Sequence, residues 1–132
     1  MIVLDTHALV WWVSADSRLS AAARQVIEQE MAQQGKILVS AISAWEIAML
    51  IEKGRLTLTM DVDEWLDKVA SIEVVSFVSI TPRVAVQSTR LPGSFHADPA
   101  DRLIVALARE SNALLITADG RIQAYPHLKW LW

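Results

Sequence analysis

The sequence predicts a single α/β domain built around a mostly parallel sheet. Short apolar runs alternate along the chain with longer segments that carry the apolar spacing of amphipathic helices. Strands that are apolar on both sides are typical of parallel sheets with helices packed against them. The chain has 132 residues, which is the size of one domain. No linker or repeat divides residues 1–132.

Short apolar runs predict five strands. Residues 1–4 form the first strand, which stops at Asp5, and the others follow at 37–39, 74–80, 114–117 and 127–132. These runs are too short for stable helices, and most are apolar throughout, which is the pattern of a strand buried on both faces. The last run is predicted to be an edge strand.

Capping residues mark the helices between these strands. Helical segments are predicted at residues 8–13 (a short helix or turn), 21–34, 40–52, 61–70, from 82 onward, and at 99–111. Ser20 and Asp61 are N-cap residues of two of them, and Pro82 and Pro99 occupy the first helical position that proline favours. Gly35 ends the second helix, because glycine readily adopts the left-handed conformation found beyond a helix.

Composition excludes several classes of function. The chain has no cysteine, which excludes disulfides, thiol nucleophiles, iron–sulfur clusters and cysteine-based zinc sites. Twelve Lys and Arg against 15 Asp and Glu give a net charge of −3, so any phosphate binding must be local or bridged by a metal. The N-terminus lacks a basic signal region, and no apolar run reaches the ~18–20 residues that span a bilayer. We expect a cytoplasmic protein with no membrane contact.

Acidic side chains follow the predicted strands. Asp5 ends the first strand, and Asp119 lies two residues past the fourth. Glu46 lies in the helix after the second strand, and Asp98 and Asp101 open the helix before the fourth, on one helical face. Binding sites of parallel sheets form beyond the carboxyl ends of the strands. We therefore expect these five carboxylates, from four segments of the chain, to converge.

Such a cluster predicts a bound divalent cation. Crowded carboxylates repel each other and raise each other's pKa, and a cation removes that penalty. Oxygen ligands without cysteine or paired histidine favour Mg²⁺ or Mn²⁺. An ion held by few carboxylates keeps several waters, one of which can attack a phosphate that the ion polarises. The predicted reaction is metal-assisted hydrolysis of a phosphodiester.

The same acids also fit ordinary structural roles. Asp98 precedes a proline and is either a metal ligand or a helix N-cap. Ser43 and Glu46 match a capping box, and Asp119, which precedes a glycine, fits a plain turn. Asp5 has no capping motif after it, which favours a functional role for that carboxylate.

Four motifs resemble one protein family. VLDTHALVWW (3–12), VSAISAWEIAML (39–50), FHADPADRLIVALA (95–108) and LLITADGRI (114–122) resemble, in order and spacing, the PIN-domain toxins of VapBC toxin–antitoxin modules. The resemblance covers essentially the whole chain and implies a PIN-like three-layer α/β/α sandwich. It implies an endoribonuclease that depends on Mg²⁺ or Mn²⁺ and is the toxin of a type II toxin–antitoxin module. The implied partners are RNA, a cognate antitoxin and a second copy of the toxin.

The resemblance also implies roles for particular residues. It implies a catalytic, metal-binding acidic quartet of Asp5, Glu46, Asp101 and Asp119. Asp98 is then an additional acid and possible ligand of the same metal. Thr6 and Thr117 match small hydroxyl residues that the family keeps near the metal. Arg102, next to the predicted metal site, is the first candidate for a contact with RNA.

Two other functions stay open at this point. A non-catalytic protein-binding module of the same fold has no need for a complete set of repelling carboxylates. A phosphatase with Asp5 as nucleophile is disfavoured, because the second acid that dehalogenase-like enzymes place two residues later is His7 here. His7 and His96 are either proton carriers near the acids or histidines without a role. No motif indicates which RNA is cleaved.

Overall fold

A five-stranded parallel sheet forms the centre of the structure, a computed structural model that describes residues 1–132. The strands are β1 (Ile2–Leu4), β2 (Ile37–Ser40), β3 (Val75–Val78), β4 (Leu114–Ile116) and β5 (Trp130–Leu131). Their order is β3-β2-β1-β4-β5, and every neighbouring pair is parallel. The prediction of a mostly parallel sheet is confirmed, with β1 at its centre.

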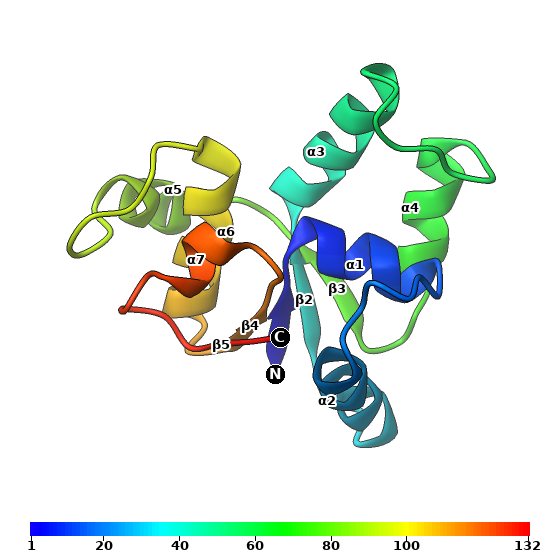
Figure 1. The fold of residues 1–132 in the computed structure, drawn as a ribbon, viewed down its shortest axis with the longest axis horizontal. Helices are drawn as coiled ribbons and strands as arrows, with labels where there is room; N and C mark the ends of the chain where they lie inside the picture. Colours follow the sequence, from blue (N-terminus) through cyan, green and yellow to red (C-terminus); the bar gives the residue numbers. More distant parts are fainter.

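Seven helices cover the sheet. They are α1 (Thr6–Val13), α2 (Ala21–Ala32), α3 (Ala41–Glu52), α4 (Val62–Ala70), α5 (Pro82–Thr89), α6 (Pro99–Glu110) and α7 (Gly120–Gln123). Figure 1 shows α1, α2 and α4 on one side of the sheet and α5, α6 and α7 on the other. Helix α3 continues beyond the carboxyl end of β2. This is the predicted three-layer α/β/α arrangement. None of these helices has the length and apolar run needed to cross a bilayer.

Alternating side chains of the strands build two cores, one on each face of the sheet. In β1, Ile2 and Leu4 join the core that also contains side chains of α1, α2 and α4. Val3, between them, joins the core formed with α6 and α7. Burial on both faces explains why the strands are apolar throughout. It also fixes the register of β1, and with it the position of the next residue, Asp5.

The structure differs from the prediction at three short elements. Helix α1 begins at Thr6, two residues earlier than predicted, and Asp5 is its N-cap. The inference that Asp5 has no capping role is wrong. Capping requires only that a side-chain oxygen accept a free N–H at the start of the helix, and Asp5 does this for the N–H of Thr6. Helix α7 was not predicted, because its four residues are too few to show helical periodicity. Strand β5 is shorter than the predicted run 127–132.

Candidate active site

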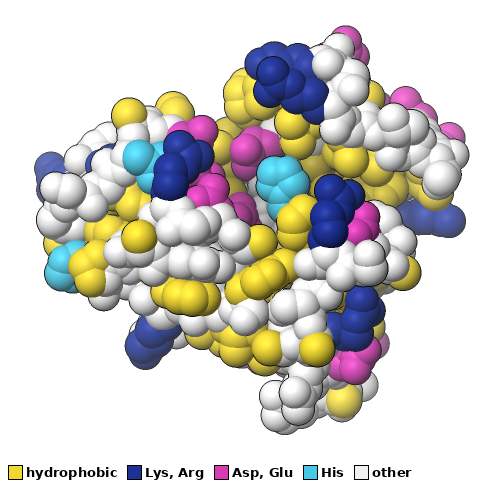
Figure 2. Space-filling view, viewed as in Figure 1, with side chains coloured by type: hydrophobic (Ala, Val, Ile, Leu, Met, Phe, Trp, Pro, Cys, Tyr) yellow, Lys and Arg dark blue, Asp and Glu magenta, His cyan; other side chains and the backbone are white.

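The carboxyl ends of β1 and β4 lie side by side at one edge of the sheet. Leu4 pairs with Ile116 in register, so the next residues, Asp5 and Thr117, are neighbours. Thr117 Oγ1 donates to Asp5 Oδ2 at 2.7 Å and accepts the backbone N–H of Asp119 at 3.1 Å. Strand register therefore brings Asp5 and Asp119 to one place. Figure 2 shows Asp and Glu side chains in a hollow of this face, with Lys and Arg on both sides.

Asp5 is the most deeply placed of these acids, with 6% of its surface exposed. Its Oδ1 accepts the backbone N–H of Thr6 at 2.8 Å, and its Oδ2 accepts the hydroxyl of Thr117. Burial raises the pKa of Asp5, the two hydrogen bonds lower it, and the negative charge of Asp101 raises it. One hydrogen bond on each oxygen leaves lone pairs on both for a cation.

Helix α3 begins earlier than a capping box at Ser43 requires. Ser40 is the N-cap, and its Oγ accepts the N–H of Ile42 at 3.2 Å. Ser43 is therefore inside the helix, and the interpretation of Ser43 and Glu46 as a capping box is wrong. Glu46 faces α1 instead, and its Oε1 accepts the hydroxyl of Thr6 at 2.6 Å.

Ser43 extends this contact. Its Oγ lies 2.8 Å from Thr6 Oγ1, and Ser43 is fully buried. The sequence pattern did not indicate this contact of Ser43, although a small polar residue on the buried side of an apolar helix is a usable signal. Burial raises the pKa of Glu46 to about 7, with the negative charges of Asp5 and Asp101 adding to the effect.

Helix α6 contributes two carboxylates. Asp98 is its N-cap and accepts the N–H of Asp101 at 3.0 Å, so the capping role of Asp98 is confirmed and its role as a ligand stays a prediction. Asp101 is 8% exposed, and its Oδ2 lies 2.6 Å from Nε2 of His96. Burial raises the pKa of Asp101, the hydrogen bond from His96 lowers it, and the charges of Asp98 and Asp119 raise it. His96 thus lies within the cluster.

Asp119 and Arg121 close the cluster on the side of α7. Asp119 Oδ1 accepts the N–H groups of Arg121 and Ile122 at 2.8 and 3.3 Å, so Asp119 caps a helix rather than forming a plain turn. Nη2 of Arg121 lies 3.8 Å from carboxylate oxygens of both Asp101 and Asp119. These contacts connect Asp119 and Asp101 to each other, and Thr117 connects Asp119 to Asp5. Glu46 is connected to the same edge through Thr6.

Arg102 points away from the acids. Its Nε donates to the carbonyl of Ser88 at 2.8 Å, and its Nη1 donates to the carbonyls of Phe95 and His96 at 3.0 and 3.1 Å. These bonds attach the loop before α6 to the end of α5. The structure thus gives Arg102 a role in positioning this loop, and its contact with RNA stays a prediction.

The donor set of this cluster fits a hard divalent cation. The donors are carboxylate and hydroxyl oxygens, and burial raises the pKa of Asp5, Glu46 and Asp101, a penalty that a bound cation offsets. No three His, Asp or Glu side chains lie close enough together to share one ion. Mg²⁺ needs fewer, because it is held in proteins by one or two carboxylates and keeps several waters.

Comparison with known proteins gives a consistent result. The model of the PIN domain family matches residues 2–128. Ribonuclease VapC22 of Mycobacterium tuberculosis is 43% identical over 126 residues, which are 96% of this chain and 92% of that protein.

Solved structures share the fold at low identity. A chain of the Rickettsia felis VapBC2 structure, bound to a DNA fragment from their promoter, has a TM-score of 0.71 at 19% identity and covers 99% of this chain and 98% of its own. A chain of FitAcB from Neisseria gonorrhoeae has a TM-score of 0.67 at 17% identity, covering 100% and 97%. The family match and the 43% identical relative settle the classification: this chain belongs to the PIN-domain family.

Proposed function

We propose that this PIN-domain protein is a metal-dependent endoribonuclease and the toxin of a type II toxin–antitoxin module. The observation that carries the proposal is the convergence of acids from separate segments at the carboxyl edge of β1 and β4. The relative named Ribonuclease VapC22 supports ribonuclease activity. The similar fold of a toxin–antitoxin complex from Klebsiella pneumoniae fits the module. RNA is the proposed substrate, and the cytoplasm is the proposed location.

The proposed metal is Mg²⁺ or Mn²⁺. Asp5 and Asp101 are its proposed direct ligands, Asp119 and Glu46 act through water or a second ion, and Asp98 is an additional candidate ligand. When bound, the ion would neutralise a phosphate oxygen and make a water more acidic. Hydrogen bonds hold two of these acids in place, from the Thr6 hydroxyl to Glu46 and from the Thr117 hydroxyl to Asp5.

Glu46 is the proposed general base. Burial raises the pKa of Glu46 to about 7 in the metal-free protein, and a bound cation would lower it, so that the carboxylate is ionised and can accept a proton from the attacking water near neutral pH. The hydroxyl of Thr6, at 2.6 Å from Oε1, fixes the direction of this carboxylate. Water attacks the phosphodiester in line, the 3′-oxygen leaves, and the product carries a 5′-phosphate. No covalent intermediate is needed.

A cognate antitoxin and a second copy of this chain are the proposed protein partners. Trp45 on α3 is 57% exposed, which is unusual for so large an apolar side chain and is typical of contact surfaces. It lines a cavity of about 330 Å³ together with Glu46 and Asp98. A partner segment seated there would cover these two acids and block the site.

Cleavage of labelled RNA tests the proposed function. We expect cleavage with Mg²⁺ or Mn²⁺ and none with EDTA. Asp5→Asn and Asp101→Asn should each lower activity by about 100-fold or more while the circular dichroism spectrum stays that of the parent. Asp67→Asn, at an exposed acid of α4, is the matched control and should cleave normally.

Other results of this assay would contradict the proposal. Full cleavage by both site variants, or in EDTA, would reject the metal mechanism. Release of inorganic phosphate from a small ester with RNA left intact would indicate a phosphatase. A folded protein that does neither would indicate a docking module.

A further inference from the structure

A second cavity adjoins the acids on the side of α1. It has a volume of about 250 Å³ and lies between α1, the end of α3 and the loop after α3. Thr6, whose hydroxyl donates to Glu46 at 2.6 Å, lines this cavity as well. Its volume is below the ~300–1,000 Å³ of drug-sized pockets. The cavity therefore lies next to the candidate active site, with Thr6 between them, and its volume suits one small planar group.

Aromatic rings form one wall of this cavity. His7 and Trp11 lie on successive turns of α1, with ring centroids 5.6 Å apart and planes inclined at 48°. The guanidinium carbon of Arg18 lies 4.9 Å from the centroid of the Trp11 ring. Asp16 holds it there by accepting bonds from Nε and Nη2 of Arg18 at 3.1 and 2.8 Å. Unpaired bases stack on aromatic rings and guanidinium planes of this kind.

Arg55 supplies positive charge at the opposite wall. It follows α3, its side chain is exposed, and it takes part in none of the ion pairs of the chain. The charge of Arg18, in contrast, is balanced by Asp16. Of the two arginines that line the cavity, Arg55 is therefore the one whose charge is free to bind a phosphate. Figure 2 shows Lys and Arg side chains beside the acidic hollow.

We propose that this cavity receives the base of a nucleotide next to the scissile phosphate of single-stranded RNA. In this arrangement His7 and Trp11 contact the base, and Arg55 binds a flanking phosphate. The proposal rests on the ribonuclease function and adds a subsite for one unpaired base, because a base within a duplex cannot enter this cavity. The combination of rings with guanidinium groups favours a nucleotide here, whereas the cavity at Trp45 is mostly apolar.

An abasic scan tests the base contact. The probe is a 5′-labelled single-stranded RNA of about 20 nucleotides containing all four bases, and its cleavage site is first mapped with Mn²⁺ and the parent protein. A series of the same RNA then carries one abasic residue at each position around that site. At one position beside the cut, kcat/KM of the parent should fall about 10-fold or more, which is the scale of a lost stacking contact.

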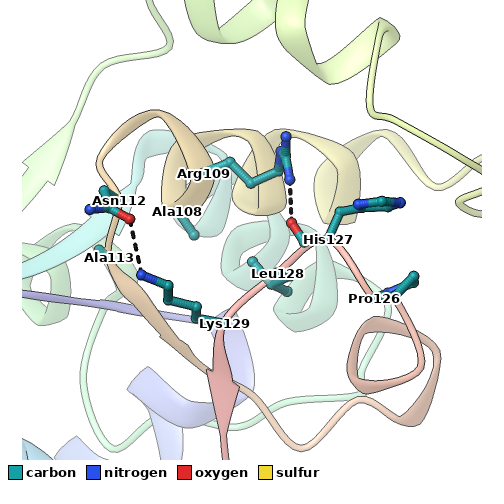
Figure 3. Close-up of a pocket in the computed structure, with 8 residues that line it drawn as sticks. All are labelled: Ala108, Arg109, Asn112, Ala113, Pro126, His127, Leu128 and Lys129. Atoms are coloured by element: carbon teal, nitrogen blue, oxygen red, sulfur yellow. Dashed lines mark hydrogen bonds between the residues drawn. The ribbon is translucent and has the colours of Figure 1, made fainter.

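Variants link this loss to the cavity. In His7→Ala, at an exposed position, and in Trp11→Leu, the intact RNA should be cleaved more slowly and the abasic residue should carry little further loss. His127→Ala is the matched control, because His127 lines a separate cavity of about 360 Å³ beside the end of α6, shown in Figure 3. This control should keep the abasic profile of the parent.

Salt dependence tests the phosphate contact. Binding of the same RNA to Asp101→Asn protein is measured by fluorescence anisotropy at several salt concentrations, with and without Arg55→Ala. Loss of one phosphate contact should lower the slope of log affinity against log salt by about 1. Lys129→Ala, in the cavity of Figure 3, changes the charge equally and should leave the slope unchanged.

Three results would overturn this inference. One is an abasic penalty that persists undiminished in His7→Ala and in folded Trp11→Leu. Another is a parent protein that cleaves RNA with no penalty at any position. The third is an unchanged salt slope when Arg55→Ala is added to Asp101→Asn, together with unchanged RNA cleavage in all cavity variants. This result is expected if a protein segment occupies the cavity. Failure of the parent to cleave any RNA would instead reject the proposed function itself.

Discussion

Replacement of Glu46 by glutamine is expected to stabilise the metal-free protein at pH 8 and to stabilise it much less at pH 5. Burial raises the pKa of Glu46 from an ordinary 4.5 to about 7. The folded protein therefore holds a proton on this group that the unfolded chain releases above pH 4.5. The contribution of Glu46 to the free energy of unfolding of the metal-free protein is fully present below pH 4.5 and is lost as the pH rises toward 7. Glutamine removes this loss and still accepts the hydroxyl of Thr6.

The size of the effect follows from the same pKa. One pKa unit corresponds to about 1.4 kcal/mol, so the full difference corresponds to about 3 kcal/mol above pH 7. Glu46 is only partly buried, and solvent screening reduces this to about 1–2 kcal/mol. For a chain of this length, 1 kcal/mol shifts Tm by about 4 °C. Glu46→Gln should therefore raise Tm by about 4–8 °C at pH 8.

Thermal unfolding followed by circular dichroism in EDTA, at pH 5 and pH 8, measures this effect. Glu52→Gln, at an exposed residue of the same helix, is the matched control and should shift Tm little at either pH. A lower Tm of Glu46→Gln at pH 8, or an equal shift at both pH values, would refute the reasoning. Either result would mean that the ionised carboxylate of Glu46 is not destabilising in this site.

Three further predictions concern the supports of the site and its metal. Thr117→Val removes the donor to Asp5 and the acceptor for the N–H of Asp119 in a fully buried position. Urea unfolding should therefore show a free energy of unfolding lower by about 1–3 kcal/mol, and RNA cleavage should fall. Thr117→Ser should retain both the stability and the cleavage. Arg102→Met leaves three carbonyls without their donor and should lower the free energy of unfolding by roughly 2 kcal/mol. The control Arg90→Met, at an exposed position, should leave it unchanged. Equal Tm values of the two variants would contradict the role of Arg102 in positioning the loop before α6. Mg²⁺ at about 100 times its Kd should stabilise the protein by about 2.7 kcal/mol, and by less at pH 5 than at pH 8, because its ligands must be deprotonated.

The positions of Asp5 and Asp119 were predictable because they follow strands whose sequences have one sensible interpretation. A run such as residues 2–4 is apolar and ends at an acid, so both burial and direction follow from the pattern. Parallel pairing of β1 with β4 then brings the two acids together without any knowledge of loops. The acids of α6 were placed by the same logic, since Asp98 and Pro99 mark a helix start.

Other parts of the site depend on the path of the chain in three dimensions. The bonds of Arg102 go to carbonyls of a loop whose course no periodic pattern specifies. The contact of His96 with Asp101 depends on the same loop. Ser43 and Glu46 match a capping box by spacing alone, although the predicted helix 40–52 already places both inside the helix, where Ser40 is the N-cap. The contact of Ser43 with Thr6 was missed because it appears only once α1 packs against α3.

Diffraction from crystals soaked in Mn²⁺, with anomalous scattering recorded at the manganese edge, tests the central claim most directly. We predict an ion bound at the carboxyl edge of β1 and β4, about 2.0–2.2 Å from carboxylate oxygens of Asp5 and Asp101, and absent from crystals of Asp101→Asn. An ion bound elsewhere, or no ion at this edge at saturating Mn²⁺, would contradict the claim that these acids share one hard cation.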